Sequence, residues 1–150
     1  MSRTDRIAAS AFVVATLVAA GGVTFAQRSH VAPPAWAGDL NAAQLVEVRD
    51  RAGNVLLHGA LATTKDSPKE TEREADLASP SGQAGKGEIE IEIERKNGLV
   101  TENEIEVEAE KLPALTDCEV FIDGRSIGAL VTSKKGKAEL KLEWKIAPGR

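Results

Sequence analysis

Residues 88–110 have the sequence EIEIEIERKNGLVTENEIEVEAE, and this stretch decides the fold. Its apolar residues and glutamates alternate with a period of two, which indicates strands with one buried and one solvent-exposed face. Asn97-Gly98 separates the two alternating runs, and this dipeptide is a strong signal for a tight hairpin turn. The stretch therefore predicts two antiparallel strands that share an apolar face and a glutamate-rich face.

Further strands are predicted on both sides of this hairpin. In residues 44–61, valines and leucines alternate with polar residues around the turn-forming segment 50–54, which is typical of a second hairpin. Asp123-Gly124 predicts another tight turn. The remaining predicted strands lie at residues 118–122, 125–132 and 138–146. About seven short strands favour an all-β fold, either a small antiparallel β-sandwich or an open barrel, because a single open sheet would leave its apolar face in water.

Residues 62–87 interrupt this pattern and are interpreted as a polar insertion into the β domain. Ser67 and Pro68 match the N-cap and the first position of a helix, and Glu70 stands at the third helical position. This pattern predicts a short helix over residues 68–78. Because the helix would have few apolar side chains to bury, we expect it to be weakly held.

The first 26 residues are expected to direct export. Arg3 and Arg6 precede residues 7–26, which carry no charge. A basic start before an apolar run is the pattern of a secretory signal peptide, and small residues favour cleavage after Ala26. The alternative is an uncleaved anchor, because an apolar run of about 20 residues can just cross a bilayer core of about 30 Å. The protein is therefore expected to be periplasmic or extracellular, or anchored in an inner membrane through residues 7–26.

The rest of the chain divides by composition. Residues 27–43, which include Pro33-Pro34, are interpreted as a flexible spacer. Residues 44–146 form the predicted β domain, and residues 147–150 form a short tail. The edges of such a small sheet could also pair with a second copy, so a homodimer through sheet edges is one expected assembly.

The glutamates of residues 88–110 are expected to share one sheet face. Like charges directly opposite each other destabilise a sheet by a few tenths to about 1 kcal/mol per pair. Lys137, Lys141 and Lys145 alternate in the last predicted strand, and they would form cross-strand ion pairs if that strand lies beside a glutamate strand. The simplest interpretation of this face is a solvated, aggregation-resistant surface.

A second interpretation is that a cation or a basic partner occupies the face. Calcium sites usually draw converging carboxylates from a loop, whereas a pleated face spreads them, and the sequence contains no D-x-D-x-D-G loop. We therefore predict no metal or cofactor. If a cation does bind, the candidate residues are Glu90, Glu92, Glu104, Glu106 and Glu108.

Composition argues against two large classes of function. The chain has 150 residues, a net charge of −4 and a pI near 5.3, which disfavours nucleic acid as a partner. One cysteine, two histidines and no tyrosine leave few candidates for a catalytic site. The sequence lacks G-x-S-x-G, H-E-x-x-H and a phosphate-binding glycine loop. We therefore expect no catalytic residues, and an enzyme is the weakest alternative.

The few reactive side chains have structural interpretations. Cys118 alternates in phase with Val120 and Ile122, so it is expected to be a small buried hydrophobe, with an intermolecular disulfide as the alternative. His30 lies in the predicted spacer and His58 on a predicted strand, and neither has a catalytic partner in the sequence.

Part of the β domain resembles known exported domains. Residues 86–115, KGEIEIEIERKNGLVTENEIEVEAEKLPAL, resemble the opening of chordin-type (CHRD) repeats. Residues 118–142, CEVFIDGRSIGALVTSKKGKAELKL, are similar to the V-x-V-D-G-x-x-x-G hairpins of exported bacterial β-sandwich domains. The histidines usual in CHRD repeats are missing. The resemblance extends over residues 86–146, and it implies an exported β domain with a binding or structural role but no particular functional residue.

These observations lead to one expected function and two alternatives. The expected function is that of an exported, non-enzymatic β-rich domain with a binding or structural role in the cell envelope or outside the cell. The first alternative is a single-pass anchored protein with a cation-responsive acidic face, and the second is an enzyme. The identity of the partner is not encoded in any motif of the sequence.

Overall fold

The computed structural model describes residues 28–30 and 37–146, and the structural statements below refer to these residues. The signal or anchor segment predicted at residues 1–26 and the predicted tail at residues 147–150 lie outside them. The described strands are β1 (Arg28–His30), β2 (Leu45–Asp50), β3 (Val55–Ala60), β4 (Ala62–Asp66), β5 (Glu70–Ala78), β6 (Lys86–Lys96), β7 (Leu99–Glu110), β8 (Asp117–Ile122), β9 (Arg125–Val131) and β10 (Ala138–Lys145). A short 3-10 helix, η1 (Ala37–Ala42), precedes β2.

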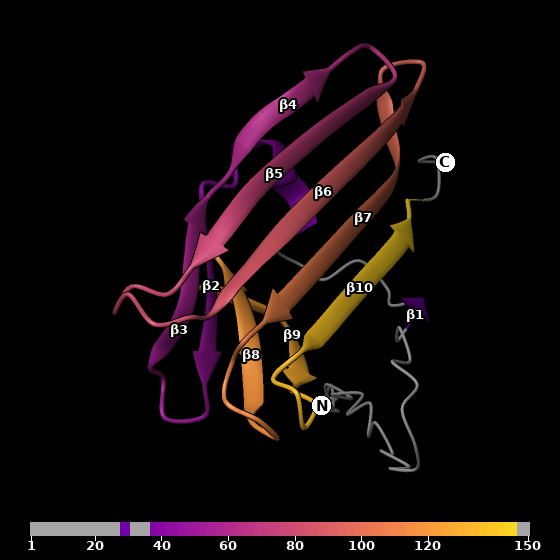
Figure 1. Ribbon diagram of the computed structural model, residues 1–150. Coiled ribbons are helices and arrows are strands. Elements are labelled where there is room, and N and C mark those ends of the chain that lie inside the picture. Colours follow the sequence, from indigo (N-terminus) through magenta and orange to yellow (C-terminus); the bar gives the residue numbers. More distant parts are fainter. Residues whose placement is uncertain (1–27, 31–36, 147–150) are drawn as a thin grey trace, which may run out of the picture.

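All ten described strands belong to one sheet. Its order is β1-β10-β7-β6-β5-β3-β2-β8-β9, and β4 pairs with β5 outside this path. Every pairing is antiparallel except that of β1 with β10. The sheet curls so that β4, β5, β6, β7 and β10 form one layer in front of β3, β2, β8 and β9 (Figure 1).

The curled sheet is nearly closed and barrel-like. On one side β3 pairs with β5 and joins the two layers. On the other side β9 approaches β10, because a Cβ atom added at Gly128 would lie 3.0 Å from the side chain of Leu140. These two strands are nevertheless not hydrogen-bonded neighbours. The prediction of an all-β, antiparallel fold is therefore confirmed, and the arrangement corresponds to the open barrel.

The core lies between the two layers and follows the predicted alternation. Ile89, Ile91 and Ile93 of β6 point inward and are fully buried. They face the back layer, where alternate valines of β2 and β8 are buried as well. Trp144 of β10 is also in the core, so the last predicted strand presents its expected face.

The three predicted hairpins are present, and the two predicted dipeptide turns use the left-handed backbone conformation. Asn97 and Gly98 have φ values of +54° and +79° and join β6 to β7. Asp123 and Gly124 have φ values of +48° and +76° and join β8 to β9. Positive φ at both central residues is the requirement of the tight turn whose twist matches that of the flanking strands.

The predicted helix over residues 68–78 is wrong, because this segment contains β5. Ser67 and Glu70 exchange main-chain hydrogen bonds of 2.8 Å and 3.3 Å, which close a hairpin between β4 and β5. The hydroxyl of Ser67 also accepts from the main-chain N–H of Glu70 at 3.1 Å. Serine therefore supplies the local hydrogen bond that the sequence pattern suggested, but in a turn rather than at a helix start.

The polar insertion predicted at residues 62–87 is likewise wrong over most of its length. Residues 62–66 and 70–78 are strands, residues 67–69 form the turn between them, and residues 79–85 form the loop that leads into β6. The inward positions of β5 include Thr71 and Arg73, both of which are buried. Polar side chains at inward positions hide the apolar alternation that would have identified the strand.

The spacer predicted at residues 27–43 is also only partly correct as a description. Residues 28–30 pair with β10 as a short parallel strand. Residues 37–42 form η1, and Leu40 and Ala43 are buried in the core. Residues 37–43 therefore belong to the folded domain, whereas residues 31–36 lie outside the described residues.

Candidate binding face

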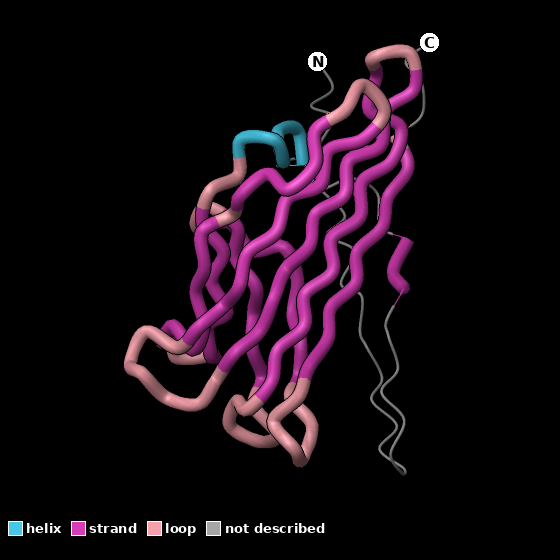
Figure 2. The backbone as a smooth tube through the Cα atoms, turned by 45° about the horizontal axis from the view of Figure 1, so that its top comes forward, coloured by secondary structure: helices cyan, strands magenta, loops and turns pink. Residues whose placement is uncertain are grey.

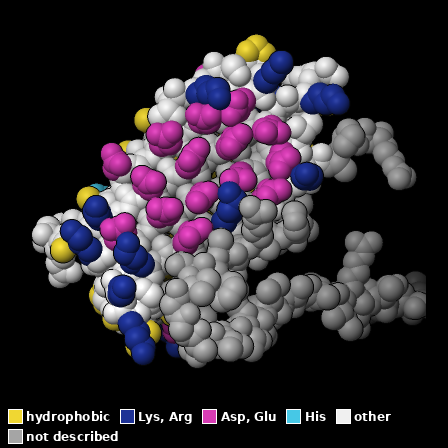
Figure 3. All heavy atoms as spheres, turned by 45° about the vertical axis from the view of Figure 1, so that its right-hand side comes forward, with side chains coloured by type: hydrophobic (Ala, Val, Ile, Leu, Met, Phe, Trp, Pro, Cys, Tyr) yellow, Lys and Arg dark blue, Asp and Glu magenta, His cyan; other side chains and the backbone are white. Residues whose placement is uncertain are grey.

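The outward side chains of β5, β6, β7 and β10 form four rows across the front layer. Cross-strand register places each residue beside its counterpart on the next strand. We call these sixteen positions the acidic face (Figure 3). Its rows are Asp76–Glu88–Glu108–Glu139, Glu74–Glu90–Glu106–Lys141, Glu72–Glu92–Glu104–Glu143 and Glu70–Glu94–Glu102–Lys145.

Sequence reasoning found the centre of this face but not its full width. The five candidate residues, Glu90, Glu92, Glu104, Glu106 and Glu108, all lie on it. The carboxylates of β5 were missed because this strand was expected to be helical. The signal that could have found them is the sequence of residues 70–76, ETEREAD, in which acidic residues recur at every second position.

Lysines compensate the charge at the β10 edge of the face. Lys141 forms ion pairs with Glu104 and, at 3.1 Å, with Glu106. The hydrogen bonds that the Lys141 ammonium donates to Glu104 and then to Glu106 raise its pKa. Lys145 lies 3.7 Å from Glu102, so the last strand does lie beside a glutamate strand and forms the cross-strand ion pairs considered for that arrangement.

At the opposite edge of the face, one lysine of the described residues compensates the charge. Lys65 of β4 forms ion pairs of 2.7 Å with Glu70 and 2.8 Å with Glu72. Hydrogen bonds to these two carboxylates raise the pKa of Lys65 and lower the pKa of Glu70. Both edges are therefore partly neutralised, and the excess of negative charge is concentrated between them.

The centre of the face has no such compensation among the described residues. None of their cationic side chains forms an ion pair with Glu88, Glu90 or Glu108. Partial loss of hydration, followed by repulsion from Glu74, raises the pKa of Glu90. Partial loss of hydration, followed by repulsion from Glu88, also raises the pKa of Glu108. The central carboxylates are therefore held in an environment that disfavours their charged form.

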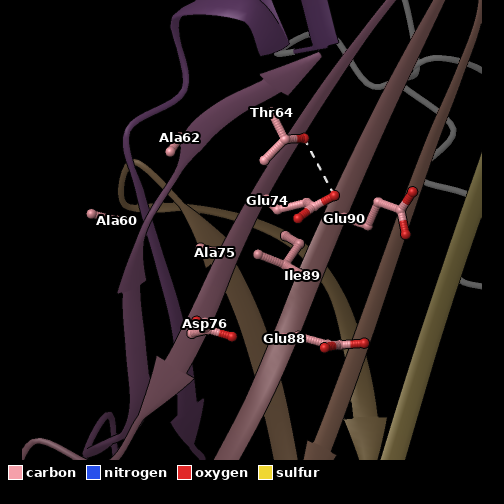
Figure 4. A pocket seen from close by; sticks show the side chains of 9 residues that line it. All are labelled: Ala60, Ala62, Thr64, Glu74, Ala75, Asp76, Glu88, Ile89 and Glu90. Atoms are coloured by element: carbon pink, nitrogen blue, oxygen red, sulfur yellow. Dashed lines mark hydrogen bonds between the residues drawn. The ribbon is translucent and has the colours of Figure 1, made fainter.

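A shallow hollow borders the centre of the acidic face. It has a volume of about 440 Å³ and lies between β4 and the carboxylates of β5 and β6 (Figure 4). The short side chains of Ala60, Ala62 and Thr64 leave this space open beside Glu74 and Glu90. The hydroxyl of Thr64 donates a hydrogen bond of 3.3 Å to Glu74.

The face does not have the geometry of a metal site. Within residues 28–30 and 37–146, no group of three or more His, Cys, Asp or Glu side chains is arranged to hold a metal ion. On adjacent positions of a pleated sheet, carboxylates are separated by about 5 Å across strands and about 7 Å along them. This spacing distributes negative charge over a plane instead of focusing it on one point.

The two histidines and the cysteine, which have the side chains most often used in catalysis, lie apart from one another. His58 is exposed on β3 and pairs in register with Glu47 of β2. Cys118 is buried on β8, and burial raises the pKa of its thiol. The prediction that Cys118 is a small buried hydrophobe is therefore confirmed. His30 lies on β1, which pairs with β10 on the other side of the molecule.

The fold thus defines an all-β domain with a nearly closed, barrel-like sheet and one densely acidic outer face. No protein-family model matches the sequence, and no curated protein and no solved structure matches the chain. Among the described residues there is no helix with the length and apolar character needed to span a membrane.

Proposed function

We propose that this protein is an exported, non-enzymatic binding module whose acidic face binds a basic segment of a partner protein. The observation that supports the proposal is the row structure of the face, with carboxylates aligned on four neighbouring strands and lysines confined to its edges. Export is supported by the basic start and the uncharged run of residues 7–26. The same features are compatible with a cleaved signal peptide and with a membrane anchor.

The arrangement costs more stability than a merely soluble surface requires. A solvated face does not require charges of a single sign, since interspersed lysines would provide solubility without repulsion. The central rows instead place Glu88 beside Glu108 and Glu90 beside Glu106. A partner that supplies lysine or arginine side chains would relieve this repulsion, and charge complementarity of this kind also accelerates association.

The planar spacing of the carboxylates favours an extended basic surface over a single ion. Each row offers several acceptors at intervals that neighbouring basic side chains of one peptide segment could span together. The hollow beside Glu74 and Glu90 adds room for the stem of a long side chain, because alanines line its other edge.

Binding of the full chain to a short polylysine peptide tests the proposal. Glu74→Gln, Glu90→Gln and Glu108→Gln combined should weaken binding at least about tenfold at low salt, because three acceptors that have no ion pair among the described residues are lost. The matched control combines Asp39→Asn, Asp117→Asn and Glu119→Gln, which remove the same net charge from positions outside the face. We expect the control to bind nearly as well as the parent protein.

Two outcomes would overturn this function. Equal weakening in both triple variants would mean that only net charge matters. Absence of polylysine binding by the parent protein at low salt would mean that the acidic face is a solvated surface and not a binding site.

A further inference from the structure

The two crossings between the layers at one end of the sheet form a rigid platform. Residues 111–116 lead from β7 to β8 and residues 132–137 lead from β9 to β10, and the two segments lie side by side (Figures 1 and 2). The N–H of Leu112 donates to the carbonyl of Gly136 at 3.1 Å, and the N–H of Leu115 donates to the carbonyl of Ser133 at 3.3 Å. The buried hydroxyl of Thr132 joins the same two segments.

The buried side chain of Thr132 holds this platform together as both a hydrogen-bond donor and a hydrogen-bond acceptor. Its hydroxyl donates to the carbonyl of Pro113 at 2.6 Å and accepts from the N–H of Thr116 at 2.8 Å. The side chains that the two segments project outward are therefore held in a fixed arrangement. We call this platform, with its outward residues Lys111, Leu115, Lys134 and Lys135, the basic end.

The lysines of the basic end differ from those of the acidic face in having no partner. Lys111, Lys134 and Lys135 are all exposed, and no carboxylate of the described residues forms an ion pair with them. They come from two different segments that the hydrogen bonds described above hold together. A protein with a net charge of −4 thus presents three free cationic groups at one end.

Leu115 belongs to the same platform, and both its exposure and its backbone conformation are unfavourable. Its side chain is 67% exposed, and its backbone has a φ of +52°. A bulky side chain in the left-handed region is uncommon and strained, and such strain is often retained where it serves a function. Burial in the core cannot be the benefit here, because the side chain points into solvent. Val131, another exposed apolar residue, pairs in register with Asp117 of β8 close by.

The described strand β1 lies beside the middle of β10 and runs in the same direction. β1 runs parallel to β10, with Arg28 beside Lys141 and His30 beside Glu143. Arg28 is therefore the residue of β1 nearer to Ala138, where β10 begins directly after the basic end.

We propose that the basic end rests on an anionic membrane surface. Leu115 enters the interfacial region of the bilayer, and Lys111, Lys134 and Lys135 contact the anionic headgroups. Apolar and cationic side chains that project together from one rigid platform suit such a surface, which offers both a hydrocarbon boundary and negative charge. The strands then run away from the membrane, and the acidic face remains open at the side of the domain.

A polarity-sensitive fluorophore on the full chain tests this orientation. The protein carries Cys118→Ala and Leu115→Cys, and a nitrobenzoxadiazole dye is attached to the cysteine at position 115. It is reconstituted into vesicles of phosphatidylcholine alone or of phosphatidylcholine with about 30% phosphatidylglycerol. We expect a blue shift and an increase in emission only in the anionic vesicles, and reversal of both at high salt. The matched control carries the dye at Leu99→Cys, because Leu99 is 63% exposed at the opposite end of β7.

A charge variant completes the experiment and separates this proposal from the function of the acidic face. Lys111→Gln, Lys134→Gln and Lys135→Gln combined should abolish the blue shift at position 115 while polylysine binding is retained. Equal responses at positions 99 and 115, an unchanged shift in uncharged vesicles, or a shift that survives the lysine substitutions would each overturn the proposal. Loss of polylysine binding in the acidic-face variant, with the blue shift at position 115 retained, would support membrane contact through the basic end independently of the acidic face.

Discussion

The guanidinium group of Arg73, on β5, donates a hydrogen bond of 3.0 Å to the main-chain carbonyl of Leu40, in η1. It also donates to the carbonyls of Asn41 at 2.7 Å and Leu61 at 3.4 Å. Arg73 is only 7% exposed, and no carboxylate of the described residues forms an ion pair with it. A buried cation thus donates to three main-chain carbonyls, and two of these bonds fasten η1 to the inside of the sheet.

Replacing this side chain should destabilise the fold without changing its strands. Arg73→Ala removes three hydrogen bonds to main-chain carbonyls together with a buried side chain, so we expect the free energy of unfolding to fall by roughly 2–3 kcal/mol. Urea denaturation monitored by circular dichroism measures the change. Arg125→Ala, at an exposed position of β9, is the matched control and should alter stability by less than about 0.5 kcal/mol. Equal effects of the two substitutions would mean that η1 is not held by Arg73.

The same arginine explains why part of the fold could not be predicted from the sequence. All seven strands expected from alternation are present, because each has apolar side chains at its inward positions. β5 was missed because Thr71 and Arg73 occupy inward positions, and each has a hydrogen-bond partner that is distant in sequence, Arg95 for Thr71 and Leu40 for Arg73. The role of η1 was missed for the complementary reason, since its main-chain acceptors are recognised only once β5 lies beside them.

The strand order reflects a competition between repulsion of facing glutamates and burial of apolar side chains, and charge repulsion alone would predict a different order. Repulsion between facing glutamates argues against placing β5, β6 and β7 side by side, at up to about 1 kcal/mol for each pair. Burial of one isoleucine contributes about 1.5–3 kcal/mol, and β6 alone buries Ile89, Ile91 and Ile93. Inward burial therefore outweighs outward repulsion, and the acidic face follows from the apolar pattern beneath it.

The acidic face should make the protein more stable at mildly acidic pH. The pKa values of Glu90, Glu92, Glu102 and Glu108 are all raised above the ordinary value of 4.5, chiefly by partial loss of hydration. A carboxyl whose pKa is raised by folding stabilises the folded state when protonated, and this contribution is lost as the pH rises through its folded pKa. We therefore expect a higher melting temperature near pH 5 than near pH 7.5.

Folding lowers the pKa of Asp50 and Glu70, so their contribution to stability depends on pH in the opposite way. This contribution is lost only when the pH falls below the ordinary pKa of the carboxyl group. The pH of maximum stability should therefore lie just above 4.5, before these groups become protonated. Glu90→Gln combined with Glu108→Gln should raise the melting temperature at pH 7.5 and reduce its change between the two pH values. A parent protein that is least stable near pH 5 would contradict this expectation.

Calcium should stabilise the protein no more than sodium chloride at equal ionic strength. The carboxylates of the acidic face repel one another, so screening by any salt should raise the melting temperature. Their planar spacing provides no converging set of ligands for a divalent ion among the described residues. Thermal melts with calcium chloride or sodium chloride, matched in ionic strength, should therefore coincide. A saturable shift specific to calcium would contradict this and would favour a cation-responsive face.

The platform at the basic end depends on a close approach that only glycine permits. Gly136 has a φ of +71°, and a Cβ atom added there would lie 2.1 Å from the carbonyl oxygen of Leu112. Gly136→Ala must therefore push residues 111–116 away from residues 132–137. We expect a loss of roughly 3 kcal/mol or more, which combines left-handed backbone strain with a displaced main chain.

Gly82 provides the matched control, because its φ of +70° is nearly the same and nothing lies within 4 Å of an added Cβ atom. Gly82→Ala should cost only the backbone strain, about 1–2 kcal/mol. The difference between the two unfolding free energies then measures the contact with Leu112 alone. If the two substitutions cost the same, the two crossings are not held together at Gly136. In that case Leu115 and the lysines of the basic end would lack the fixed arrangement on which membrane contact depends.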